Sequence, residues 1–142
     1  MAHDSVEHTE SVREVRRVID DWRNAVNAGD IDRILQIAAD DVEIMPPGQP
    51  ALSGANAREF LQGFVSQFRA DLQPFRNEEI IMCGEWAIQR LTYEITLTPK
   101  SGGDPITESG DGFHIFRRDV ATRSWRLVKD ISTSVPAASA EA

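Results

Sequence analysis

Apolar residues recur every three or four positions near the start of the chain, which is the period of one face of a helix. The stripe consists of Val12, Val15, Ile19, Trp22 and Val26. Ser11 and Glu14 have the spacing of a capping box, in which both side chains satisfy free amides at a helix start. Gly29 suits the left-handed conformation that ends many helices. We therefore predict a helix from Ser11 to about Ala28.

Two further helices and a short strand are predicted before residue 75. Asp30 is a suitable N-cap for a second helix. The apolar face of that helix comprises Ile31, Ile34, Leu35 and Ala38. Residues 42–45 alternate like a strand, and the prolines at 46 and 47 stop it. A third helix opens at Ser53, and Pro74 closes the region. The inner side of this third helix comprises Phe60, Leu61, Phe64 and Phe68.

The second half of the chain changes to the alternation typical of strands. Four β segments are predicted, at about 75–83, 86–98, 106–118 and 124–133, with turns or loops at 84–85, 99–105 and 119–123. Helices followed by a run of strands indicate an α+β fold, with three N-terminal helices packed on a curved antiparallel β-sheet. We predict one domain at 11–134, a flexible lead at 1–10 and a flexible tail at 135–142.

Composition and charge narrow the function classes. The chain has 142 residues and a formal net charge of −8, which argues against non-specific binding to nucleic acid or to anionic lipid. The single cysteine, Cys83, excludes an internal disulfide, and its apolar neighbours predict a buried structural thiol. No run of about 18 apolar residues suggests a membrane span, and the polar start lacks a signal-peptide core. We therefore expect a cytoplasmic protein.

Several stretches together resemble the NTF2-like superfamily, and in particular its SnoaL-like and DUF4440 branches. The first is Trp22 followed by Asn27-Ala28-Gly29-Asp30 and then Ala39-Asp40-Asp41-Val42. The C-terminal half adds Gly84-Glu85-Trp86-Ala87, Tyr93, residues 97–103, Gly110, residues 116–118 and residues 124–131. The resemblance covers about residues 11–134. It implies a conical half-barrel, a pocket between sheet and helices, and a homodimer formed through the sheet.

The chain departs from the ketosteroid isomerases of this superfamily at the positions that matter for their reaction. The resemblance places Pro46 where those enzymes have their general base, and Trp22 where they have an oxyanion-holding tyrosine. Neither residue can take over these roles, so that mechanism is not expected here. Leu91 replaces a glycine that is common in the third strand motif, and Ser132-Thr133-Ser134 replaces a Trp-Asn-Ser ending.

Asp130, His114 and Tyr93 are the candidate catalytic residues. A carboxylate among apolar walls can serve as acid or base, and His114 is the only histidine outside the N-terminal lead. Their strands are expected to be hairpin neighbours, so a His–Asp pair is allowed, although the sequence does not set the register. The alternative for each is structural: an ion pair of Asp130 with Arg90, or an outward-facing histidine.

Ligand contacts are expected from side chains shared by the core and a pocket. They are Trp22, Met45, Phe60, Phe64, Gln89, Leu91 and Phe116. Aromatic residues at helical spacing pack a core more often than they bind a ligand, and a phenol or amide on a strand can equally be satisfied by backbone groups. No metal-ligand spacing and no nucleotide-binding motif is present, so we expect neither metal nor cofactor.

Three functions remain open from the sequence. The first is an isomerase- or cyclase-type enzyme that transfers a proton on a small apolar carbonyl compound. The second is a non-catalytic carrier or sensor of a small apolar or aromatic ligand. The third is a dimeric association domain, for which strand residues such as Arg90, Glu94 and Arg117 would form the rim of an interface.

Overall fold

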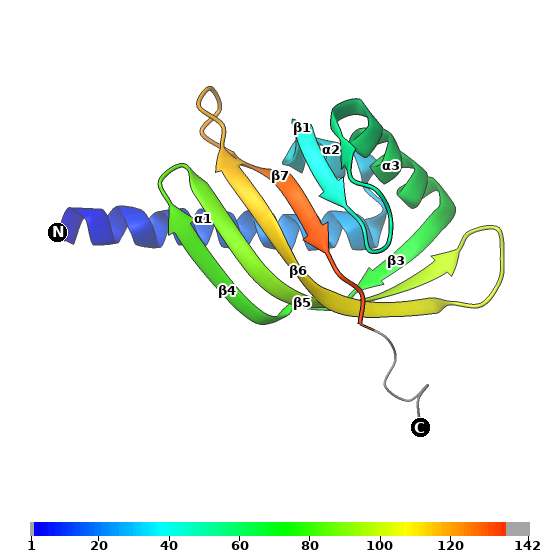
Figure 1. Cartoon of the computed structure of the whole chain (residues 1–142). Helices are drawn as coiled ribbons and strands as arrows, with labels where there is room; N and C mark the ends of the chain where they lie inside the picture. Colours follow the sequence, from blue (N-terminus) through cyan, green and yellow to red (C-terminus); the bar gives the residue numbers. More distant parts are fainter. Residues whose placement is uncertain (1, 136–142) are drawn as a thin grey trace.

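The computed structural model describes residues 2–135, and helices cover one face of a strongly curved sheet (Figure 1). The helices are α1 (Ala2–Ala28), α2 (Ile31–Ile37) and α3 (Gly54–Gln67). The strands are β1 (Ala38–Met45), β2 (Leu52–Ser53), β3 (Phe68–Leu72), β4 (Arg76–Cys83), β5 (Trp86–Pro99), β6 (Ile106–Arg118) and β7 (Trp125–Ser132). The predicted tail lies outside the described residues from position 136 onward.

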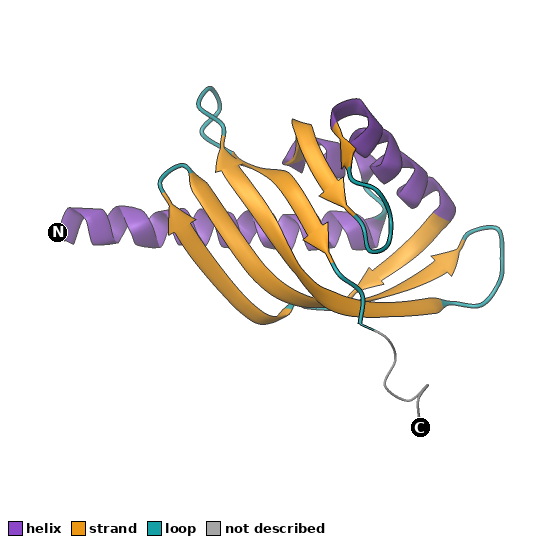
Figure 2. Ribbon diagram, viewed as in Figure 1, coloured by secondary structure: helices purple, strands orange, loops and turns teal. Residues whose placement is uncertain are grey.

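The sheet has seven strands in the order β2-β1-β7-β6-β5-β3, and β4 also pairs with β5. Figure 2 shows that the sheet is curved and does not close, with α1 running across its concave side. These features confirm the predicted α+β fold. The sheet is not purely antiparallel, however, because β1 runs parallel to β7. Helix α3 and five strands separate β1 from β7 in sequence, so local alternation could not reveal their relative direction.

Helix α1 begins much earlier than the capping box predicts. It starts at Ala2, so the described part of the predicted lead is helical. Residues 2–10 contain no proline or glycine that would stop a helix. Ser11 lies inside the helix, where its hydroxyl accepts a hydrogen bond of 2.8 Å from the guanidinium of Arg118. A tertiary contact thus takes the place of the predicted cap.

The other helix ends follow the predicted signals only in part. Gly29 has φ 66°, and the Asp30 side chain accepts a hydrogen bond from the amide of Arg33, as expected for a C′ glycine and an N-cap. The second helix ends at Ile37 and the third at Gln67, because Ala38 and Phe68, each predicted to lie on a helix, instead begin β1 and β3. Strand pairing decides the latter: Phe68 lies opposite Pro99 of β5.

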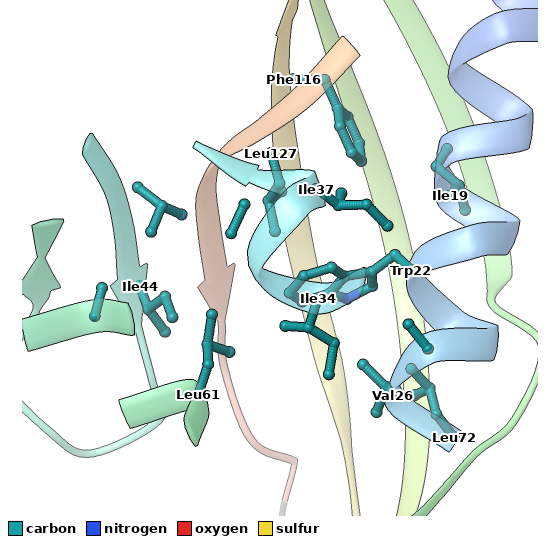
Figure 3. Packing of buried hydrophobic residues seen from close by; sticks show 14 of the residues in the cluster. Ile19, Trp22, Val26, Ile34, Ile37, Ile44, Leu61, Leu72, Phe116 and Leu127 are labelled. Atoms are coloured by element: carbon teal, nitrogen blue, oxygen red, sulfur yellow. The ribbon is translucent and has the colours of Figure 1, made fainter. Parts of the chain in front are cut away.

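The core lies between the concave face of the sheet and the helices (Figure 3). From α1 it takes Val15, Ile19, Trp22 and Val26, which are four of the five predicted stripe residues and are all buried. Phe116 of β6 and Leu127 of β7 face this stripe, and each is 1% exposed. Burying large apolar side chains on both layers is what holds the helices to the sheet.

Two glycines allow the end of β7 to lie very close to β6. A Cβ atom on Gly110 would stand 1.7 Å from the carbonyl oxygen of Thr133, and one on Gly112 would stand 2.6 Å from that of Ile131. Both contacts are with backbone, so a side chain at either position would force the two strands apart. The backbone of residues 131–133 thus occupies the space that side chains at positions 110 and 112 would fill.

Cys83 is exposed, so the prediction of a buried thiol is wrong. It is the last residue of β4, next to the turn at Gly84, where φ is 59°. Apolar neighbours in the sequence did not indicate burial because β4 pairs with β5 alone and alternate side chains face outward. No helix within residues 2–135 is long and apolar enough to cross a lipid bilayer.

Candidate functional site

His114 of β6 and Asp130 of β7 lie directly opposite each other in the sheet. The ring Nε2 atom is 3.4 Å from the Asp130 Oδ1 atom. The His114 side chain is 8% exposed and that of Asp130 is 20% exposed, so the pair reaches from the interior toward its edge. The strand register thus brings together the two residues that the sequence could only suggest as partners.

A β-bulge in β7 aims Asp130 at this position. Phe116 pairs with Leu127 and Ile115 pairs with Lys129, which leaves Val128 as an extra residue in β7. Because of this extra residue, both Leu127 and Asp130 face the concave side, although simple alternation would separate them. Lys129 faces the other way, where its ammonium group lies 2.7 Å from the carboxylate of Glu43.

Gln89 and Glu78 complete a polar chain that runs from the histidine toward the surface. The His114 Nδ1 atom is 2.9 Å from the Gln89 carbonyl oxygen, and the Gln89 amide donates a 2.8 Å hydrogen bond to the Glu78 carboxylate. The guanidinium of Arg16 is 3.4 Å from the same carboxylate. Gln89 is fully buried. Glu78 was not predicted as a site residue, although its alternation with the inward-facing Ile80 could have placed it on the concave side.

Three aromatic rings surround the imidazole. Phe75, Phe116 and Trp22 lie 5.7, 6.1 and 6.5 Å from His114 between ring centroids, all edge-to-face. Such contacts fix the plane of a ring by the match between positive edges and negative faces. The imidazole is therefore held among three aromatic rings, with the Gln89 carbonyl oxygen at Nδ1 and the Asp130 carboxylate near Nε2.

Tyr93 lies farther along the same concave face, on β5. Its hydroxyl donates a 3.1 Å hydrogen bond to the carbonyl oxygen of Thr133. Burial raises the pKa of this phenol, and the negative charges of Glu108, Asp130 and Asp111 raise it further. The hydroxyl therefore keeps its proton at neutral pH, and it donates this proton to the Thr133 carbonyl oxygen.

The remaining predicted contact residues divide between two faces. Leu91 is 2% exposed on the concave face, and Phe60 and Phe64 of α3 are partly buried against the core. The prediction for Met45 is wrong. Met45 pairs across the strands with Ile131, and Ile131 pairs with Phe113, so all three side chains share the convex face. It therefore does not belong to the concave wall. Asp130 likewise has no contact with Arg90, whose guanidinium donates to the carbonyl of Asn77.

Two surface hollows lie away from the His114–Asp130 pair. One, of about 420 Å³, is lined by residues that include Gly29, Arg69 and Lys100. The other, of about 320 Å³, is lined by residues that include Pro47 and Glu108. Neither lining contains a predicted site residue. Among the described residues, no group of three or more His, Cys, Asp or Glu side chains is arranged to hold a metal ion.

The sequence matches the SnoaL-like domain family over residues 15–124. This span is most of the chain, which therefore belongs to that family. The match and the fold together place the chain in the NTF2-like superfamily, as the sequence resemblance implied. No curated protein matches the sequence.

Solved structures share the fold at low sequence identity. A conserved protein from Planctomyces limnophilus is 24% identical, with a TM-score of 0.78 over 92% of this chain and 99% of its own. A proposed dehydratase of the NTF2-like family from Streptomyces avermitilis is 18% identical, with a TM-score of 0.80 over 91% and 99%. A ketosteroid isomerase-like protein from Erwinia carotovora atroseptica is 22% identical, with a TM-score of 0.77 over 90% and 98%.

Proposed function

We propose that this chain is an enzyme that binds a small, largely apolar carbonyl compound at the edge of the concave face and transfers a proton on it. The observation that carries the proposal is the His114–Asp130 pair, held 3.4 Å apart between apolar rings and a buried amide. An imidazole can take up and release a proton, and a carboxylate beside it can share the proton that it takes.

The chemistry begins with the carbon next to the carbonyl group. The His114–Asp130 pair removes a hydrogen from this carbon as a proton, and the electrons of the C–H bond form an enolate. The hydroxyl of Tyr93, on the same concave face, is the candidate donor to the enolate oxygen, and it would exchange its hydrogen bond to the Thr133 carbonyl oxygen for this one. Return of the proton to the same carbon, or to another one, completes an exchange or an isomerisation.

The family and the names of related structures support proton transfer without fixing the reaction. The neighbours described above include a proposed dehydratase and a ketosteroid isomerase-like protein. Both classes of reaction move a proton on a small organic molecule. The ketosteroid isomerase mechanism itself is not proposed, because the sequence resemblance places Pro46 and Trp22 where those enzymes have their base and their tyrosine. Membership of the DUF4440 branch stays a prediction.

Deuterium exchange tests the proposal without knowledge of the natural substrate. The probe is 2-tetralone, an apolar aromatic ketone with acidic hydrogens next to its carbonyl group. The full chain is expected to accelerate the loss of these hydrogens in heavy water, as followed by proton NMR, above the rate with heat-unfolded protein. Binding of the ketone with no acceleration would instead favour the carrier or sensor. If the chain neither binds the ketone nor accelerates its exchange, the proposal is rejected.

We also propose that the convex face of the sheet forms a homodimer. Across strands β4, β5, β6 and β7, cross-strand pairs place Ile81 in line with Ile88 and Ile115, and Phe113 beside Ile131. Phe113 and Ile81 are each 44% exposed, and Trp86 is 41% exposed. A continuous apolar patch of this kind on a sheet is typical of a protein–protein interface, and the superfamily resemblance gives a second copy as the partner.

Replacing Phe113 by Asp is expected to weaken the dimer by roughly 30-fold or more, because a charge would be buried at the centre of the interface. Sedimentation velocity over a range of protein concentrations measures the change. Ile106→Asp is the matched control, since Ile106 is 51% exposed on β6 but pairs with Leu97 on the concave face. A monomeric wild-type chain at micromolar concentration, or equal effects of both substitutions, would contradict this proposal.

A further inference from the structure

In the polar chain behind His114, the chemistry of the side chains determines which group donates and which accepts in each hydrogen bond. An ionised carboxylate only accepts hydrogen bonds, whereas an amide group has an NH₂ donor at one end and a carbonyl acceptor at the other. Glu78 lies 2.8 Å from one end of the Gln89 amide. The NH₂ group must therefore face Glu78, and the carbonyl oxygen must face His114.

The orientation of Gln89 in turn determines which ring nitrogen of His114 carries the proton. The carbonyl oxygen of Gln89 is 2.9 Å from the Nδ1 atom, a normal hydrogen-bond length. A carbonyl cannot donate, so the hydrogen of this bond belongs to Nδ1. On the other side of the ring, the Nε2 atom is 3.4 Å from Asp130, which is longer than an N–H···O bond. In the neutral ring the lone pair is therefore on Nε2.

Hydrogen bonds to β5 hold the backbone next to Glu78 in position. A β-bulge lies between Arg76 and Glu79, and within it Asn77 has a φ of 51°. The Asn77 side-chain amide donates to the hydroxyl of Thr92, and the main-chain carbonyl oxygen of Asn77 accepts from Arg90. The side chain of Glu78 then meets Gln89 on the concave side and Arg16 of α1 at the surface. Contacts from β4, β5 and α1 together fix the position of Glu78.

We infer that Glu78 is a positioning residue: acting through Gln89, it holds His114 in the Nδ1–H tautomer and so presents the Nε2 lone pair toward Asp130 and the proposed ligand. In the proton transfer described above, Nε2 then receives the hydrogen from carbon, while Nδ1 keeps its hydrogen throughout. The catalytic meaning of the inference rests on the proposed function. The tautomer itself does not.

The experiment measures the tautomer by NMR in the full chain with ¹⁵N-labelled histidine, at a pH where the ring is neutral. His114 is assigned from the signals that disappear in His114→Gln. The wild-type ring is expected to show a protonated Nδ1 and an unprotonated Nε2. In Glu78→Gln the side-chain amide of Gln89 can flip by 180°, because the new glutamine at position 78 can both donate and accept a hydrogen bond. The ratio of the Nδ1–H to the Nε2–H form is then expected to fall by roughly five-fold or more, as a charge-assisted hydrogen bond is replaced by a neutral one.

Asp130→Asn is the matched control, since it alters the other side of the ring and leaves Glu78 and Gln89 in place. The Nδ1–H tautomer is expected to persist in this variant. A wild-type ring protonated at Nε2, or a tautomer ratio that Glu78→Gln leaves unchanged, would overturn the inference. Failure of the ketone to exchange with deuterium would reject the proposed function alone, because the tautomer is measured without any substrate.

Discussion

Deuterium exchange into 2-tetralone is expected to slow by about 10²–10⁴-fold when His114 is replaced by Gln, the usual range for loss of a general base. Glutamine is close in size to histidine but cannot take up a proton at neutral pH. Asp130→Asn is expected to fall in the same range, because the carboxylate that shares the proton is lost. The double variant is expected to be little slower than either single variant, since the two residues act as one unit. The rates are measured by proton NMR in heavy water.

His8→Gln is the control for the first substitution, because His8 is exposed on α1 and lies outside the sheet. It should exchange the ketone at the wild-type rate. Circular dichroism of each variant shows whether the fold is retained. Wild-type exchange rates in both folded single variants would exclude His114 and Asp130 as the proton-transferring pair, even if the chain still binds the ketone.

The fold was predictable because its signals are local. The α1 stripe repeats with a helical period, and the strands of the second half alternate and are separated by turn residues such as Gly84. These patterns report which side chains are to be buried. They do not report which strand lies beside which, so the parallel pairing of β1 with β7 was missed. The extension of α1 before Ser11 was missed because Ser11 was interpreted as the cap at the helix start. In the structure its hydroxyl instead accepts a hydrogen bond from Arg118.

The candidate site depended on register, which the sequence does not encode in a local pattern. His114 and Asp130 face each other only because β7 carries one extra residue at Val128, and nothing in that apolar stretch marks a bulge. Glu78 was hidden for a related reason. It lies in a polar run at the start of β4 that reads as exposed, yet the strand turns it toward Gln89. Met45 shows the converse, an apolar residue on the convex face that was assigned to a pocket.

Replacing Phe116 by Ala is expected to lower the free energy of unfolding by about 3–5 kcal/mol, the range for removing a buried aromatic ring. The ring is 1% exposed, pairs with Leu127 across the strands and lies against His114. A cavity would remain because both packed layers contribute to its walls. Since small domains are stable by only about 5–15 kcal/mol, this one change would remove a large share of the total.

Urea unfolding measures this loss as a shift in the transition midpoint at a constant slope, which shows that stability and not compactness has changed. Ile106→Ala on the same strand is the control, because Ile106 is 51% exposed and its truncation is expected to change stability by no more than about 0.5 kcal/mol. A loss below about 1 kcal/mol for Phe116→Ala would mean that the interior can close around the missing ring. The imidazole of His114 would then not be held by rigid neighbours, and the site could not be treated as preorganised.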